Sequence, residues 1–467
     1  MLTKLRFKNF KAWKDSGDIR LAPLTVLFGT NSAGKTSIPQ LLLMLKQTAD
    51  SPDRQRALQM GDSRTLVDLG TFEDALHNHD VSHKLEIDLD WNLNEPLQIS
   101  DPLTKKKFEG SEMSLHVCIS AGKNRQPVVS EVRYELKSGG AIQVDIEMKR
   151  KSNKNKYDVA SPHSNYKLTR HSGRVWPVSE PVRFYGFPDE VAAYFQNAMF
   201  ATDFVLQFEK MLRSIFYVGP LRETPKRLYM WSGEVPDHVG TKGDRAIEAI
   251  LAAGDRRFNL KEKSRSRQLA ELVAAWLKKI GMIRDFRVKP LGDGRKEYEV
   301  LVRTGPKMAE VKLTDVGFGV SQLLPVLVES FFVPPRSIMI FEQPEIHLHP
   351  RVQAEMADLF IEAVKMREDG KPRDCQFIIE SHSEHFLRRL QRRIAEEELT
   401  ADQAALYFVH TEDGAARLEP LDVDPYGNIR NWPENFFGDE MEDLVARSEA
   451  QAKRMAAQQA PQDGGRQ

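Results

Sequence analysis

The chain has 467 residues, 41% of them hydrophobic and 29% charged, which suits two or three domains or one large α/β domain with insertions. Its 67 basic and 67 acidic side chains cancel, so no net charge attracts it to nucleic acid or membrane, and DNA binding would need a local patch. Two isolated cysteines, a charged start and no apolar run of about 18 residues predict a cytoplasmic protein without a membrane partner.

The N-terminal part predicts two strands and a helix around a glycine-rich loop. Residues 4–8 alternate polar and apolar, residues 24–28 have the composition of a buried strand, and residues 37–47 follow as a helix. Between residues 85 and 170, alternating segments separated by Gly, Asn and Ser predict an antiparallel β insertion. The basic run at 149–156 is interpreted as a solvated loop, with a nucleic-acid contact as the alternative.

The C-terminal half predicts helices alternating with strands. Helical spacing covers residues 190–214 and 262–280. The elements expected after them are strands at 285–291 and 296–304, a helix following the glycine-rich segment 315–322, a strand at 337–341, a helix at 351–366, and strands at 376–381 and 405–410. Residues 449–467 contain too few apolar side chains to pack and are predicted to be disordered.

The stretch "GTNSAGKT", residues 29–36, matches the phosphate-loop pattern G-x-x-x-x-G-K-[ST] between a predicted strand and a predicted helix. Glycines at such positions allow backbone N–H groups to point at phosphates, the lysine reaches the β- and γ-phosphates, and the hydroxyl binds Mg²⁺. The predicted ligands are therefore ATP and Mg²⁺. The candidate nucleotide-binding residues are Gly29, Thr30, Asn31, Ser32, Ala33, Gly34, Lys35, Thr36 and Ser37.

Three later motifs argue against a small-molecule kinase. They add a metal carboxylate, a second anion site at a helix start and a strand-end histidine to the phosphate loop. The strand "SIMIF" ends at Glu342, where P-loop proteins place a Mg²⁺ carboxylate, so Thr36 and Glu342 are the candidate metal residues. The segment "DVGFGVSQ" places a glycine-rich turn at a helix start, with Ser321 as the expected N-cap. The strand "FIIES" leads to His382, whose imidazole is a candidate contact for the terminal phosphate.

The order of these motifs resembles the ABC-type ATPase heads, and in particular the prokaryotic RecF/SMC-like and OLD-like ATPases. The segments that carry the resemblance extend from residue 5 to about 437: "LRFKNFKAWKD", "LFGTNSAGKTS", "LGTFEDALH", "YVGPLRE", "DVGFGVSQLLPVL", "FEQPEIHLHP", "IIESHSEHFL" and "YGNIRNWPENFF". The resemblance implies an α/β P-loop NTPase head with a mixed sheet, an inserted antiparallel β region and a helical subdomain.

The domain division expected from this resemblance has five parts. These are 1–80 and 311–440 as the two parts of the ATPase head, 81–215 as a mainly β insertion, 216–310 as a helical and strand arm, and 441–467 as a tail. In the related heads the signature segment caps the ATP of a second subunit, and here that segment comprises Gly317, Gly319, Ser321 and Gln322. The resemblance therefore implies a head-to-tail homodimer or higher homo-oligomer that controls a protein effector in DNA maintenance or phage defence, with DNA as a further candidate partner.

Position 343 departs from the acidic pair that most related heads carry after this strand. Gln343 stands where a carboxylate would accept the proton of attacking water, and an amide cannot accept that proton, although it can orient the water. Glu345 is the nearest candidate base. Slow hydrolysis assisted by Glu345 or Gln343, with His382 at the γ-phosphate, is favoured over an inactive site. An ATP-gated scaffold with little turnover is the second hypothesis.

Other side chains admit alternative interpretations. A zinc site is one alternative for four histidines, because H-x-H places two rings on one face of a strand: His347, His349, His382 and His385. The motifs above already account for all four, so zinc is not favoured. Asp422 and Asp424 resemble a nuclease D-x-D, but a turn before Gly427 is favoured. A phosphate or interface contact and a surface salt bridge are both open for Arg222. The candidates for packing the C-terminal segment on the core, or for a docking patch, are Trp432, Pro433, Phe436 and Phe437.

Overall fold

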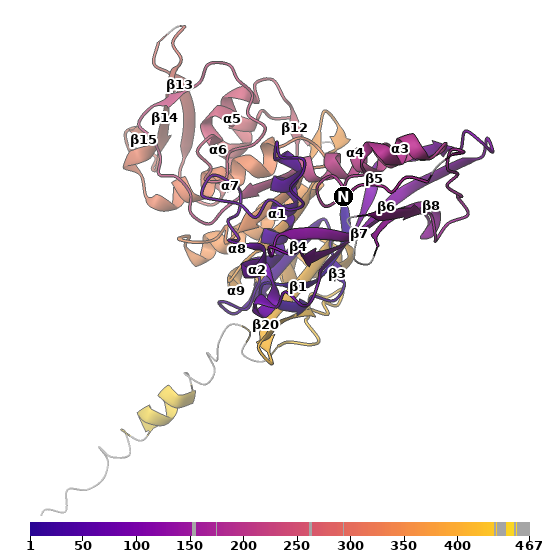
Figure 1. Cartoon of the computed structure of the whole chain (residues 1–467). Coiled ribbons are helices and arrows are strands. Elements are labelled where there is room, and N and C mark those ends of the chain that lie inside the picture. The colour runs from indigo at the N-terminus through magenta and orange to yellow at the C-terminus, as the bar shows by residue number, and fades with distance from the viewer. Residues whose placement is uncertain are drawn as a thin grey trace, which may run out of the picture.

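The computed structural model describes residues 1–151, 156–173, 175–260, 264–292, 294–433, 436, 445–452 and 454. Two sheets dominate this part of the chain (Figure 1). One is built mainly from parallel strands that lie far apart in the sequence, and the other is antiparallel and built from strands largely consecutive in sequence.

The parallel sheet has the strand order β10-β16-β19-β4-β20-β21. Its strands are β10 (Ile215–Val218), β16 (Ile338–Glu342), β19 (Gln376–Glu380), β4 (Leu24–Gly29), β20 (Ala404–Glu412) and β21 (Ala415–Pro420). Only β21 runs antiparallel to its neighbour β20. All residues of β16 and β19 are buried, as expected for parallel strands covered on both faces.

The antiparallel sheet has the order β2-β1-β5-β6-β7-β8-β9, with β3 paired to β1. Its strands are β1 (Leu2–Phe10), β2 (Trp13–Asp15), β3 (Ile19–Arg20), β5 (Leu85–Ser100), β6 (Lys107–Ala121), β7 (Pro127–Ser138), β8 (Ala141–Arg150) and β9 (Tyr157–Ala160). The inserted β region is therefore one sheet with the N-terminal strands, because β5 pairs with β1. Figure 1 shows β5 to β8 and helices α3 and α4 on one side of the molecule and β13 to β15 on the other.

Two small sheets and several helices complete the described fold. The small sheets contain β11 (Tyr229–Met230), β13 (Asp285–Pro290), β14 (Glu297–Arg303) and β15 (Val311–Lys312), and β12 (Phe258–Asn259), β17 (Arg367–Glu368) and β18 (Lys371–Pro372). The α-helices are α1 (Ser37–Asp50), α2 (Phe72–Ala75), α3 (Asp189–Tyr194), α4 (Phe200–Arg213), α5 (Ala246–Ala252), α6 (Leu269–Lys279), α7 (Phe318–Phe332), α8 (Pro350–Lys365) and α9 (Glu384–Ala395). Short 3-10 turns occur at His77–His79, Leu313–Asp315 and Ala401–Gln403.

Alternate residues of the parallel strands enter two different hydrophobic cores. Ile338, Ile340 and Ile378 pack with α1, α4 and the antiparallel sheet, whereas Met339 and Phe341 pack with α5 to α9. This follows from the period of two in a strand, which sends successive side chains to opposite faces. The parallel sheet is thus the middle layer of the molecule, and it fixes which face each strand-end residue occupies.

The predicted fold class, α/β with a mixed sheet and an antiparallel β region, is confirmed, as are the strands expected around the phosphate loop and at β5 to β8. The helix expected over 262–280 begins only at Leu269, and 261–263 lie outside the described residues. Most of the basic run at 149–156 and most of the predicted C-terminal tail also lie outside the described residues. The five-part domain division stays a prediction. Within the described residues, no helix has the length and hydropathy needed to cross a bilayer.

The Gln376 side chain joins the two main sheets. Its Oε1 accepts from Leu2 N at 3.1 Å, and its Nε2 donates to Leu2 O at 2.8 Å and to Ala22 O at 3.0 Å. The Gln376 residue is 1% exposed, so water cannot replace these bonds without rearrangement.

We therefore predict that Gln376→Ala lowers the free energy of unfolding by about 2–4 kcal/mol, because it leaves buried backbone groups without partners. Urea unfolding measures this effect. The exposed Gln126, changed to Ala, is the matched control, and an equal loss in both variants would contradict the assignment.

Candidate functional site

The phosphate loop lies between β4 and α1, and its shape depends on two glycines. Gly29 has φ 143°, and a Cβ there would collide with the Val409 carbonyl oxygen of β20. Gly34 has φ 97°, and its carbonyl accepts from Trp13 Nε1 at 3.0 Å. Side-chain-bearing residues rarely adopt these conformations, so both positions need glycine. The loop leads directly into α1 at Ser37, with the helix N-terminus beside it.

Lys35 and His382 both lie against this loop. Lys35 is 3% exposed, and its Nζ donates to Gly29 O at 3.1 Å and to Thr30 O at 2.6 Å. Burial lowers the pKa of Lys35. His382 hydrogen-bonds with the Gly29 carbonyl, and burial, followed by the charge of Lys35, lowers the pKa of its imidazole. The structure therefore brings the strand-end histidine to the start of the phosphate loop.

Two carboxylates lie at neighbouring strand ends beside the loop. Glu342 ends β16 and Glu380 ends β19, and they are paired residues in the parallel register. Thr36 Oγ1 donates to Glu380 Oε1 at 3.1 Å. Burial raises the pKa of Glu342 to about 7, and the adjacent Glu380 adds to the rise. Burial also raises the pKa of Glu380, against the effect of Thr36 and Lys35.

The turn after β16 positions Gln343 and Glu345. Gln343 has φ 41°, its backbone N donates to Glu380 O at 2.9 Å, and its amide side chain approaches the Glu380 carboxylate and lowers its pKa. Glu345 is 5% exposed and its Oε1 accepts from Ser381 Oγ at 2.8 Å and from His382 N at 2.7 Å. Burial raises the pKa of Glu345. The two candidate catalytic residues thus hold the end of β19 from the neighbouring strand.

The signature segment starts α7, and the expected role of Ser321 as its N-cap is wrong. Gly317 is the N-cap, while Ser321 lies inside the first turn and its hydroxyl donates to Phe318 O at 2.6 Å. Ser321 and Gln322 are buried, whereas Gly317 and Phe318 are exposed and Gly319 is half-buried. Gly317 has a non-helical backbone, with φ −56° and ψ 146°, and the helix begins at the next residue, Phe318. The surface that this segment offers to another molecule is therefore formed first by Gly317 and Phe318.

Arg222 connects the signature helix to the turn after β16. Its guanidinium is buried and donates to the carbonyls of Gln322, Gln343 and Pro344 at 3.3 Å, with Glu342 O at 3.5 Å. The surface salt bridge considered for Arg222 is therefore wrong. Burial lowers its pKa to about 10. A buried cation that neutralises backbone carbonyl dipoles in this way fixes the two segments relative to each other.

The structure also bears on the zinc, D-x-D and C-terminal packing interpretations. His347 lies in a turn with φ 64°, and His349 is the N-cap of α8, so the two rings do not share a strand face. Asp424 accepts from the backbone N of Tyr426 and of Asn428 at 2.9 Å, which is the bonding of a turn. Phe436 packs edge-on against Phe28 and Phe408, as expected for packing of the C-terminal segment, and Phe437 lies outside the described residues.

Comparison with known families decides the identity of the domain. A family model described as "AAA ATPase domain" matches residues 1–173 and 247–387, which is more than half of the chain. The chain belongs to this AAA ATPase family. A second model, described as "Protein of unknown function (DUF3696)", matches residues 399–446. No curated protein matches the chain. The match confirms the predicted resemblance at the level of an AAA ATPase domain.

Among solved structures, the AAA ATPase is similar to SMC heads. An SMC head bound to the C-winged helix domain of ScpA gives a TM-score of 0.41 at 12% identity, over 91% of this chain and 98% of that one. The SMC head domain from Thermotoga maritima gives a TM-score of 0.38 at 14% sequence identity, over 90% of this chain and 99% of that one. A Pyrococcus furiosus Smc head with an extended coiled coil gives a TM-score of 0.40 at 10% sequence identity, over 97% of this chain and 99% of that one. These values describe a distant likeness.

Sequence reasoning missed Glu380. The signal was present, because "FIIE" is an apolar strand ending in an acidic residue, just as "MIFE" is. The carboxyl ends of parallel strands meet at one edge of a sheet, so two such strands predict two adjacent carboxylates. Tyr217 was also missed. Its side chain hydrogen-bonds with Glu342 from the edge strand β10, and burial raises the pKa of its phenol.

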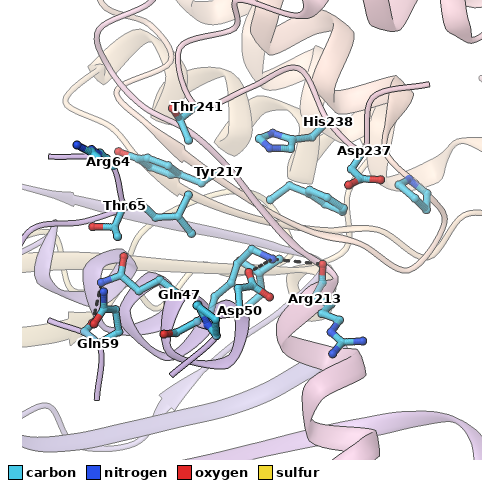
Figure 2. Close-up of a pocket in the computed structure, with 17 residues that line it drawn as sticks. Gln47, Asp50, Gln59, Arg64, Thr65, Arg213, Tyr217, Asp237, His238 and Thr241 are labelled. Carbon is cyan, nitrogen blue, oxygen red and sulfur yellow. Dashed lines mark hydrogen bonds and ion pairs between the residues drawn. The ribbon is translucent and has the colours of Figure 1, made fainter. Parts of the chain in front are cut away.

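A large cavity of about 840 Å³ lies beside α1 and β10 (Figure 2). It is lined by Gln47 and Asp50 from the second half of α1, by Tyr217, and by Asp237 and His238 from a loop. Phosphate-loop residues 29–37 are not among its lining residues, so the cavity is distinct from the phosphate cradle. Lys46 of α1 also lines the cavity, and its Nζ donates to the Arg213 carbonyl at 3.5 Å.

Behind this cavity, Glu329 of α7 is buried next to His238. Val239 N donates to Glu329 Oε2 at 2.9 Å, and burial raises the pKa of Glu329 to about 8. His238 Nδ1 lies 3.9 Å from Glu329 Oε1 but accepts from Gly240 N at 3.1 Å, so this nitrogen carries no proton. Burial lowers the pKa of His238. The pair is therefore a neutral imidazole beside a protonated carboxyl rather than an ion pair.

We predict that the AAA ATPase loses stability as the pH rises from about 5 to about 8, because folded Glu329 keeps a proton that an unfolded carboxyl has released. Glu329→Gln removes this dependence. Relative to the variant, the wild type should lose roughly 3 kcal/mol of unfolding free energy across this range. Urea unfolding without nucleotide measures the difference, with the exposed Glu95→Gln as control. Parallel pH profiles of wild type and Glu329→Gln would refute the assignment.

Proposed function

We propose that this AAA ATPase binds ATP with Mg²⁺ at its phosphate loop and hydrolyses it slowly. The observation that carries the proposal is the convergence of Thr36, Glu342 and Glu380 beside Lys35 at one edge of the parallel sheet. Carboxylate and hydroxyl oxygens are the ligands Mg²⁺ prefers, and Glu380 Oε2 is buried without a hydrogen-bond partner, so the residues fit the ion. Thr36 and Glu342 would hold Mg²⁺, which would supply charge neutralisation at the phosphates.

Other protein groups would bind the phosphates, contact the γ-phosphate and handle the attacking water. The backbone N–H groups of residues 29–37 and the N-terminus of α1 bind phosphate oxygens, and Lys35 moves from its loop carbonyls to the β- and γ-phosphates. His382 contacts the γ-phosphate from the end of β19. Glu345 accepts the proton of the attacking water while Gln343 orients that water. Glu345 Oε1 already accepts two hydrogen bonds, so the buried and unpartnered Oε2 is the oxygen left to accept the proton, and restricted access of water to it makes turnover slow.

Two copies assemble head to tail around ATP in this proposal, and the signature segment of one copy reaches the phosphate loop of the other. The exposure of Gly317 and Phe318 at the start of α7 supports it, as does the sequence resemblance to RecF/SMC-like heads. The ATP-linked dimer then controls a partner protein in DNA maintenance or phage defence. An ATP-gated scaffold with little turnover is the second candidate, favoured by Gln343 at the position of the usual carboxylate.

Turnover measurements separate these two candidates. We expect Lys35→Ala to lose ATP binding at least about tenfold, and Glu345→Gln to keep binding while turnover falls about 100-fold, the usual effect of removing a general base. Gln343→Glu tests whether a carboxylate at that position accelerates turnover. Wild-type turnover in Glu345→Gln would exclude Glu345 as the base. ATP-dependent oligomerisation without measurable turnover in the wild type would favour the scaffold.

Complementation tests the composite site. We expect Lys35→Ala and Gly317→Glu each to abolish turnover and an equimolar mixture to recover up to about a quarter of the wild-type rate per chain, since a mixed dimer retains one intact site. Gly317 has open space around its Cβ position, so the substitution leaves the fold intact. A mixture as inactive as its components would contradict a site completed by a second subunit. ATP-dependent mass in solution provides the independent check.

A further inference from the structure

We propose that Glu380 is a metal-site residue of this ATPase and that it supplies from β19 the second carboxylate that the chain lacks at position 343. The inference rests on the proposed ATP·Mg²⁺ site. It adds a residue that no motif in the sequence assigns and explains why glutamine is accommodated after Glu342.

The sheet places Glu380 beside both candidate metal residues. Glu342 and Glu380 are paired at the ends of β16 and β19, and strand alternation puts their side chains on the face that Ile340 and Ile378 share. The α1 helix covers this same face, and Thr36 directly before it donates to Glu380 Oε1 at 3.1 Å. One hydroxyl and two carboxylates from three segments of the chain therefore lie at the same edge of the sheet, with Glu380 bonded to Thr36 and paired in register with Glu342.

The residues around Glu380 compensate its buried carboxylate only in part. The residue is 3% exposed, and its Oε2 is buried without a hydrogen-bond partner among the described residues. The nearby Lys35 Nζ donates to two loop carbonyls, Gly29 O and Thr30 O. Buried carboxylates are paired, protonated or bound to metals. Glu380 would hold a divalent cation at this oxygen together with Thr36 and Glu342, and the cation would supply the positive charge that the carboxylate lacks.

Gln343 completes the arrangement as a positioning residue. Its backbone N donates to Glu380 O at 2.9 Å, and its amide approaches the Glu380 carboxylate. An amide can donate to that carboxylate, whereas a glutamate at 343 would add a third negative charge beside Glu342 and Glu380. The glutamine is therefore matched to a carboxylate that comes from the neighbouring strand.

Metal binding tests the proposal without relying on turnover. The probe is Mn²⁺, followed by electron paramagnetic resonance in the presence of a non-hydrolysable ATP analogue, with analogue binding in chelator measured by fluorescence. We expect Glu380→Gln to weaken Mn²⁺ binding at least about tenfold while metal-free nucleotide binding stays within about threefold of wild type. Glu345→Gln is the charge-matched control, because it removes a buried carboxylate from the same site, and we expect its Mn²⁺ affinity to change less than about threefold.

Two further results decide the interpretation. Glu380→Asp keeps the charge but shortens the side chain, so a ligand role predicts weaker Mn²⁺ binding, while wild-type affinity in this variant would overturn it. Equal losses in Glu380→Gln and Glu345→Gln would also overturn it, since general electrostatics would then explain both. If wild-type protein fails to bind the analogue with Mn²⁺, the proposed function itself is wrong. If wild type binds and Glu380→Gln binds equally well, only the role of Glu380 is refuted.

Discussion

The parallel pairing of β16, β19 and β4 is the constraint on which the candidate site depends. These strands share one direction, so their carboxyl ends bring Glu342, Glu380 and the phosphate loop to one edge of the sheet. The register matters as much as the order. A shift of β19 by one residue would turn Glu380 toward the opposite face and replace it beside Thr36 with a neighbour of different chemistry. The two hydrophobic cores oppose such a shift, because each accepts only alternate residues of the strand.

The same burial that fixes the register makes the site electrostatically costly in the absence of ligand. Glu342, Glu345 and Glu380 are all buried, and burial raises the pKa of each. Lys35 is buried as well, with its pKa lowered. A site of this kind stabilises the fold poorly by itself, because several charges or protonated acids are removed from water with incomplete compensation. In the proposed function, nucleotide phosphates and a divalent cation would supply the missing charges, and ligand binding would then stabilise the fold.

Much of this arrangement could be predicted from the sequence, and the reasons are local. "LTVLFGTNSAGKTS" specifies strand, loop and helix because apolar β-branched residues, paired glycines and a helix-forming run follow one another. The position of Glu342 at a strand end could be predicted in the same way, because the apolar segment "SIMIF" precedes it. The sequence does mark Glu380 as a strand-end carboxylate, but its position beside Glu342 depends on strand order, which places β19 between β16 and β4 and cannot be read from either segment. The cap of α7 was mispredicted, because the Ser321 hydroxyl bonds to the local Phe318 carbonyl instead of capping the helix. The burial of Arg222 was not anticipated, because its partners are carbonyls from distant segments.

Arg222 gives the signature helix a physical connection to the nucleotide site within one chain. Its guanidinium contacts carbonyls of residues 342–344 on one side and the Gln322 carbonyl on the other. A buried guanidinium resists losing any of these partners, because an unpaired buried donor costs about 1–3 kcal/mol. Movement of the turn after β16 and movement of α7 are therefore coupled energetically. In the proposed dimer, α7 begins with the exposed Gly317 and Phe318, so a change at Glu342 or Gln343 on ligand binding is transmitted to the surface that would meet the second subunit.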